Sequence, residues 1–247
     1  MYNLIKAELY RLRHSGLYAF FMFVTAIAMA ALLPIMMNPK EYIKADLASS
    51  AFTFSQVLFA MIVLCTTTVL GVYVGTLYNN RMANYEVMNG YPTFKIITSK
   101  SLSLGFIHAL ITYIPMMVVL LIPALKNGNG LIEEPVKMFI LLFVIILHCS
   151  IVTVLYSMFF KNLVFASLLG YVRFGILDMV PTVIIVEEFP KLAEKEALNI
   201  SISQQCMSLV RETYDQRFIL WVVLSMIVES AILFGLVYYS YTRKKFR

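Results

Sequence analysis

Three ionisable side chains interrupt otherwise apolar stretches in the second half of the chain. Arg173 and Asp178 lie in one such stretch, and Glu229 lies in another. A charged group at the centre of a bilayer costs roughly 2.5–3.5 kcal/mol on insertion scales, so such groups usually face a protein interior or water. Two chemical roles fit these residue types: a polar lining or gate for a crossing molecule, and an interhelical clamp.

The spacing of these residues bears on how they pair. Arg173 and Asp178 are five residues apart, whereas side chains that meet on one α-helix are three or four apart. We therefore expect each to pair with a group on another helix. Thr67, with its neighbours Thr66 and Thr68, adds hydroxyls to an earlier apolar stretch. Such hydroxyls either line a polar path or, more commonly, bond back to the carbonyls of their own helix.

Motifs for phosphate, metal or nucleophile chemistry are missing. The sequence contains no G-x-x-x-x-G-K-[ST], H-E-x-x-H or G-x-S-x-G pattern, so it predicts no nucleotide cradle, zinc protease or serine hydrolase. His108 and His148 have no second metal-type residue at helical spacing, and we expect interior hydrogen bonds from them rather than metal binding. We predict no catalytic residue, metal or cofactor in this chain.

The elements that must position these side chains are six apolar runs, each long enough to cross a bilayer. A spanning helix needs about 20 predominantly apolar residues, and in lipid such runs must be helical because every backbone group is satisfied internally. Only 14% of the residues are charged. The prediction is an all-α integral membrane protein with a single domain over residues 1–247. The six runs are 16–37, 52–78, 101–125, 136–160, 163–186 and 218–241. The first exceeds the usual core of a cleaved signal peptide, so we expect it to be retained.

Charge alternates between successive connectors. Bases outnumber acids before the first run, between runs two and three, at Lys161 and in the C-terminal tail, whereas acids outnumber bases in residues 187–217. Lys and Arg mark the cytoplasmic side of membrane proteins. Both termini are therefore predicted in the cytoplasm of a plasma-membrane protein, expected to be bacterial. The positive charge flanks apolar runs, as topogenic charge does, so we predict no nucleic-acid partner.

Three segments outside the apolar runs carry further expectations. Residues 1–14 place Tyr2, Ile5, Leu9 and Leu12 on one helix face, which is typical of an interfacial amphipathic helix. Residues 187–217 contain helix formers after Pro190, and we expect a helical hairpin lying on the outer surface.

The inner connector, residues 79–100, combines turn formers with aromatic and Met side chains. That mixture indicates either a partner surface or a headgroup-level aromatic belt. The candidate contact residues are Tyr85, Glu86, Met88, Asn89, Gly90, Tyr91 and Phe94.

This order of segments resembles the membrane subunits of type-2 ABC exporters over almost the whole chain. That family has an N-terminal interfacial helix, six spans, a coupling helix between spans two and three, and a re-entrant hairpin between spans five and six. Here those places are held by residues 2–13, 80–94 and 187–217, with E-x-M-N-G at residues 86–90 and Lys100 opening the third run. A Gly-Thr pair and an arginine common in the family's coupling segment are absent, so topology carries the resemblance more than residues do.

The resemblance implies a permease without enzymatic activity of its own, and it is nearest to bacteriocin-immunity and peptide-export permeases. Two such subunits, expected to be identical, would pair in the lipid bilayer with two ATPase subunits that bind ATP and Mg²⁺. The implied cargo is lipophilic or amphipathic. Two alternatives stay open: a proton-coupled secondary transporter that uses Asp178 and Glu229, and a non-transporting assembly or sensor subunit. The two halves of the chain show no internal repeat, which weighs against an inverted-repeat transporter.

Overall fold

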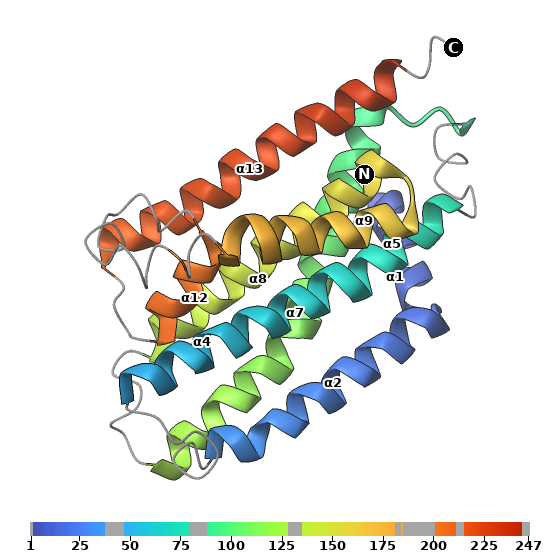
Figure 1. Ribbon diagram of the computed structural model, residues 1–247. Coiled ribbons are helices and arrows are strands. Elements are labelled where there is room, and N and C mark those ends of the chain that lie inside the picture. Colours follow the sequence, from blue (N-terminus) through green and yellow to red (C-terminus); the bar gives the residue numbers. More distant parts are fainter. Residues whose placement is uncertain are drawn as a thin grey trace.

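The computed structural model describes residues 2–37, 47–79, 88–127, 135–180, 184, 201–210 and 215–243. Over these residues the protein is a bundle of helices without strands (Figure 1). Four helical stretches are long and apolar enough to cross a membrane: Ser55–Tyr78, Thr93–Val118, Val136–Phe160 and Gln216–Arg243. The protein is therefore an all-helical membrane protein. The first and fifth predicted spans appear as helices whose described apolar parts are shorter.

The helices follow one another along the chain with two π-helical segments among them. Their bounds are α1 (Tyr2–Arg13), α2 (Gly16–Met37), α4 (Leu47–Val63), η1 (Leu64–Leu70), α5 (Gly71–Asn79), α7 (Thr93–Asn127), α8 (Pro135–Phe160), α9 (Leu163–Tyr171), η2 (Val172–Met179), α12 (Ile202–Val210) and α13 (Gln216–Arg243). α4, η1 and α5 form one continuous helix through the second predicted span, and α9 continues into η2 in the fifth.

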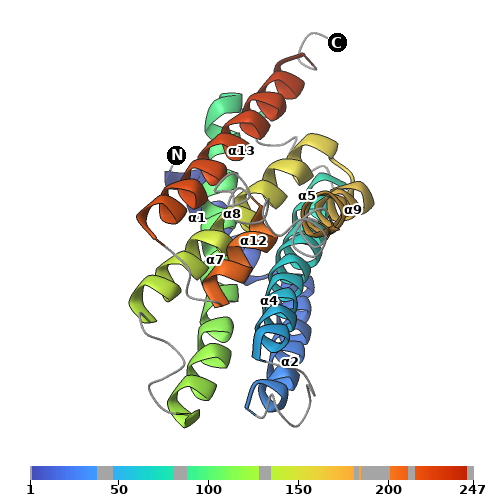
Figure 2. The same ribbon diagram turned by 60° about the vertical axis from the view of Figure 1, so that its left-hand side comes forward.

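Helix α8 occupies the centre of the bundle because it is apolar on every side. It packs against α7, α13, α9, α5, α12 and η1, and Figure 2 shows it between the other helices. Ile145, Ile146 and Leu142 are completely buried on it. Helices α2 and α13 are peripheral and expose large apolar side chains such as Phe23 and Ile232, as expected for surfaces that face lipid.

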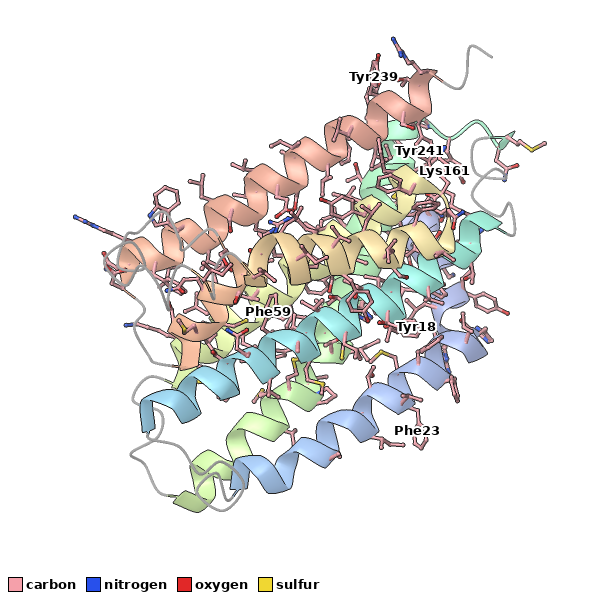
Figure 3. The ribbon with its side chains drawn as sticks, in the orientation of Figure 1. Tyr18, Phe23, Phe59, Lys161, Tyr239 and Tyr241 are labelled. Carbon is pink, nitrogen blue, oxygen red and sulfur yellow. The ribbon has the colours of Figure 1, made fainter. Side chains whose placement is uncertain are left out.

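The same end of the bundle holds α1, the start of α7, the α8–α9 turn and the last turns of α13 (Figure 1). Lys161 in that turn lies 3.8 Å from the ring centroid of Tyr241, and the Tyr241 hydroxyl donates to Tyr78 at the end of α5 over 2.5 Å (Figure 3). Phe94 of α7 meets Phe234 of α13 at 5.4 Å between ring centroids. We call this end the basic end, because Lys95, Lys161 and Arg243 lie there.

One predicted boundary is wrong. α7 begins at Thr93, directly after the turn at Gly90 (φ 77°) and Pro92, and not at residue 101. The charged residues before position 101 resemble a loop, but Lys100 is neutralised inside the bundle by Glu8 at 3.0 Å. The predicted outer hairpin is not a surface feature where it is described: α12 is almost entirely buried between α4, α8 and η2 (Figure 2). Residues 187–200 and 211–214 of the predicted hairpin lie outside the described residues.

Candidate functional site

The three ionisable residues singled out from the sequence meet inside the bundle, together with a histidine. The Arg173 guanidinium donates from Nε to Glu229 Oε1 over 2.8 Å and from Nη2 to Glu229 Oε2 over 3.0 Å. Arg173 Nη1 also lies 3.5 Å from Asp178 Oδ1, and His148 Nε2 lies 3.2 Å from Glu229 Oε2. We call these four residues the ionic cluster.

A π-helical turn brings Arg173 and Asp178 onto one side of their helix. η2 contains both residues, and a π-helix closes its hydrogen bonds between residues five apart. The expectation that these two side chains do not pair within their helix is therefore wrong, because it assumed α-helical geometry. The expectation that each also reaches another helix is confirmed, since Arg173 contacts α13 and Asp178 contacts α12.

Asp178 caps the start of α12. Its Oδ1 accepts from the backbone N–H of Ile202 over 3.2 Å, and its Oδ2 accepts from that of Ser203 over 2.8 Å. The first N–H groups of a helix have no partner within it, and the partial positive charge there favours a carboxylate. Asp178 therefore joins η2, in the fifth predicted span, to α12 by charge as well as by hydrogen bonds.

The depth of the cluster follows from the register of α13. Glu229 is the fourteenth of the 28 residues in this helix, so it lies about 20 Å along the helix axis from either end. Trp221 lies near one end of α13 and Tyr239 near the other, about 27 Å apart along the helix axis at 1.5 Å per residue. That separation fits the thickness of the hydrocarbon core between two interfacial aromatic belts. The cluster thus lies near mid-membrane.

The arrangement lets opposite charges compensate one another in a partly buried place. Glu229 accepts from the Arg173 guanidinium at each of its carboxylate oxygens, and Arg173 lies between two carboxylates. Four elements, α8, η2, α12 and α13, are connected through these contacts. His148 is 1% exposed, and its Nδ1 has no hydrogen-bond partner among the described residues. Removing one partner of such a network leaves an uncompensated buried charge, which costs about 3–5 kcal/mol.

Thr67 belongs to a helix–helix contact. Its hydroxyl donates to the Val63 carbonyl over 2.6 Å, as the commoner of the two predicted roles requires. Thr66 bonds back to Ile62 in the same way, whereas the Thr68 hydroxyl contacts that of Tyr171 on α9. η1 therefore touches α9 through polar groups close to the start of η2.

A second polar contact joins α2 to the bundle. The Tyr18 hydroxyl lies 2.8 Å from Nδ1 of His108, and Thr112 lies 3.3 Å from the other ring nitrogen. Tyr18 points into the bundle, whereas Phe23 points away from it (Figure 3). His108 is completely buried, so the expectation of an interior hydrogen-bonding histidine is confirmed.

The connector residues divide between described and undescribed parts of the chain. Tyr85 and Glu86 lie outside the described residues. Met88 is 79% exposed and Phe94 58% exposed, at the basic end. Asn89, Gly90 and Tyr91 form the turn before α7, with Asn89 and Gly90 exposed and Tyr91 half-buried.

Two contacts of the site were missed from the sequence. His148 and Glu229 are 81 positions apart, and nothing local connects them. Glu8 pairs with Lys100, and both are 1% exposed. A signal for the second pair exists in retrospect: Glu8 is the only acid in residues 1–14, and an acid among bases at a helix that abuts a span invites a buried partner.

The three cysteines lie inside the bundle. Cys65, Cys149 and Cys206 are free and buried. Burial raises the pKa of the Cys206 thiol in α12 well above its ordinary value, which keeps the thiol neutral. The described residues contain no group of three or more His, Cys, Asp or Glu side chains that could hold a metal ion.

The comparisons of this sequence with known proteins gave no match. The chain matches no protein-family model. No curated protein matches it.

Proposed function

We propose that this chain is the membrane subunit of a type-2 ABC exporter, which moves a lipophilic or amphipathic cargo, such as a peptide or a lipid-like molecule, out of the cell. A separate ATPase subunit supplies the energy. The observation that carries the proposal is the assembly at the basic end. There α1 docks through Glu8 onto Lys100 of α7, and Met88 and Phe94, before and at the start of the same helix, are exposed. An exposed apolar contact surface fixed to the start of a spanning helix is what an ATPase needs to move that helix.

The proposed route of coupling follows the packing. α7 packs along α8, and α8 carries His148 of the ionic cluster. A push on the start of α7 would reach α1 through the Glu8–Lys100 pair and α8 through the shared core. Two-state packed elements are the usual carriers of coupling between distant sites. In this proposal ATP and Mg²⁺ bind to the partner ATPase, and this chain supplies no catalytic residue.

The ionic cluster is proposed as an interhelical clamp. Glu229 joins α13 to η2 through Arg173 and to α8 through His148, while Asp178 holds the start of α12. Each charge thereby has a partner in a place where an unpaired charge would be costly. A clamp of this kind keeps α12 and α13 moving together with the central helix during a transport cycle.

The proposed assembly contains two copies of this chain and two ATPase subunits within the plasma membrane, with six spans and both termini in the cytoplasm. The positive charges of the basic end support that orientation. The apolar exterior of α2 and α13, with Phe20, Phe23, Leu220 and Ile232 exposed, is available to lipid and to a second permease subunit.

Coexpression with an ATP-binding-cassette ATPase from a neighbouring reading frame tests the proposal. We expect copurification, and no ATP hydrolysis by the chain alone. Met88→Ala with Phe94→Ala should lower the yield of the complex, because exposed apolar anchors often contribute about 2 kcal/mol or more at an interface. The matched control is Ile114→Ala with Ile140→Ala, which removes exposed side chains of α7 and α8 away from the basic end. Equal yields for the two double variants would contradict docking at the basic end.

The ionic cluster near mid-membrane also fits a second candidate, a proton-coupled transporter that uses Asp178 and Glu229. Transport by reconstituted protein separates the two. A requirement for a pH gradient without ATP, lost in Asp178→Asn or Glu229→Gln, would favour the secondary transporter. A chain that binds its partner through residues 79–100 and moves no cargo under either condition would be an assembly or sensor subunit.

A further inference from the structure

Helix α1 has three distinct faces. Leu4, Glu8 and Leu12, spaced by four residues, are buried against the bundle. Tyr2 and Leu9, seven residues apart, are exposed at 76% and 44% on the next strip of the helix. Beyond them, Lys6 and Arg13, also seven apart, are exposed. At 3.6 residues per turn, residues seven apart share a face. The exposed apolar strip of Tyr2 and Leu9 therefore lies between the docked face, which is the buried face of Leu4, Glu8 and Leu12, and the cationic strip of Lys6 and Arg13.

Glu8, the one acidic residue of this helix, lies on the docked face and is paired there. Glu8 is bound by Lys100 at 3.0 Å and by Arg11 at 2.9 Å. Lys6 and Arg13 have no ionic partner among the described residues. The outward side of α1 is consequently cationic and apolar together, with nothing acidic from its own helix to compensate it.

The position of α1 places this surface at the edge of the membrane. Glu8 contacts α7 at Lys100, two turns into a helix whose later residues form a spanning segment. α1 ends at Arg13, and Ser15 accepts from the N–H of Tyr18 to begin α2 separately. A short helix at that level exposes its apolar strip to acyl chains and its cations to headgroups.

We propose that Lys6 and Arg13 bind the headgroups of anionic phospholipids, with Tyr2 and Leu9 inserted beside them. Zwitterionic lipid offers the apolar strip the same environment but no net charge to the cations. The bound anionic surface would then hold α1 in its docked position, and through Glu8 it would stabilise the start of α7. This inference requires only that the chain lies in a membrane and does not rest on the exporter function.

Hydrogen–deuterium exchange on the full chain in nanodiscs tests it. One set of nanodiscs contains phosphatidylcholine alone, and the other contains phosphatidylcholine with phosphatidylglycerol. Each basic residue beside an anionic surface strengthens association roughly 5.5-fold, so two cations contribute about 30-fold. We expect the amides of α1 to exchange up to about 30-fold more slowly with phosphatidylglycerol, and this difference to shrink at high ionic strength.

The variant that removes the cations is Lys6→Gln with Arg13→Gln, which should lose the difference between the two lipids. Lys6→Arg with Arg13→Lys keeps both charges and should keep the difference. The matched control, Lys95→Gln with Arg243→Gln, removes exposed cations at the same end but not on α1, and it should behave as the unchanged chain.

Three outcomes would overturn the proposal. One is equal protection in both lipids, which would assign α1 to apolar insertion alone. Another is an unchanged lipid difference in the Lys6 and Arg13 double glutamine variant. The third is the same protection produced by inorganic phosphate added to phosphatidylcholine nanodiscs, which would identify a soluble anion rather than a lipid surface as the ligand.

Discussion

At the scale of single residues, the ionic cluster shows how a membrane protein accommodates charge. Arg173 alone would be very unfavourable near mid-membrane, because a guanidinium does not lose its proton in proteins. Its planar donors match the Glu229 carboxylate in two parallel hydrogen bonds, which is the geometry that makes such pairs strong. The energy of these residues therefore lies in their pairing, and it is lost when one partner is removed.

Arg173→Met and Glu229→Met should each lower stability, by up to about 3–5 kcal/mol, because each leaves a partly buried charge without its bidentate partner. The double variant should recover part of that loss, because both members of the bidentate pair are then gone and Asp178 keeps the two backbone N–H groups of α12. Thermal unfolding of the purified protein in one detergent, followed by Trp221 fluorescence, measures all three variants. An additive loss in the double variant would show that the two side chains do not act as a pair.

At the scale of elements, close approach and capping hold the helices in place. A Cβ added to Gly170 of α9 would lie 2.5 Å from Cγ2 and 2.9 Å from Cβ of Thr67 on η1. A Cβ on Gly71 would lie 3.0 Å from Oγ of Ser167. These small residues bring the second and fifth predicted spans together, as small residues do between membrane helices. The contact lies next to η2, whose π-helical turn aligns Arg173 with Asp178.

Gly170→Ala should destabilise the protein by about 1–3 kcal/mol, the usual cost of overpacking, because the Cβ of Thr67 cannot rotate away. Gly235→Ala on α13 is the control, since its Cβ would meet nothing within 4 Å. Both sites are helical, so any gain in helix propensity is common to them. Unfolding midpoints in the same detergent give the comparison, and equal midpoints would show that α9 and η1 are not in close contact.

Asp178→Ala should loosen α12 by about 2 kcal/mol or more, because two N–H groups of that helix lose a charged acceptor. Hydrogen–deuterium exchange of residues 202–210 reports the change. Asp215→Ala provides the comparison: Asp215 accepts from the N–H of Phe218 at the start of α13 over 2.7 Å. That variant should speed exchange only at the start of α13. Faster exchange of α12 in both variants would point to general unfolding rather than loss of the cap.

At the scale of the whole molecule, a central apolar helix and a charged end organise the bundle. α8 packs against helices on several sides, whereas α2 and α13 lie at the periphery and expose large apolar side chains. The helices alternate in direction, so that Lys95, Lys161 and Arg243 gather at the basic end and α12 lies toward the opposite end (Figure 1). This separation of charge is the basis for the proposed orientation in the membrane.

Cysteine labelling in intact cells checks that orientation. Gln216→Cys, at the end opposite to the basic end, should react with an impermeant reagent added outside. Asn89→Cys should react only after the cells are opened. Both positions are exposed. The unchanged chain serves as the background, because Cys65, Cys149 and Cys206 are buried. Labelling of residue 89 in intact cells would reverse the orientation.

The sequence by itself determined the class of the protein and much of its local structure. Long apolar runs must be helical in lipid, and that argument needs no knowledge of neighbours. The N-terminal helix, the turn at Gly90 and the interior bonding of His108 also follow from local residue types and spacing. Arg173, Asp178 and Glu229 were recognisable because a charge in an apolar run is costly wherever it lies.

Only the tertiary structure decided which of these residues meet. Arg173, the partner of Glu229, lies 56 positions away in the sequence, and no residue near either one indicates that the two meet. The pairing of Arg173 with Asp178 depends on a π-helical turn, whereas the prediction from the sequence assumed α-helical spacing. The sequence places Lys100 at the edge of a loop, whereas the structure pairs it with Glu8 inside the bundle. The sequence likewise predicts α12 at the surface, whereas the structure buries it. The sequence shows that a charged group in an apolar stretch would be costly if it were unpaired, whereas the three-dimensional packing of distant helices determines which partner it has.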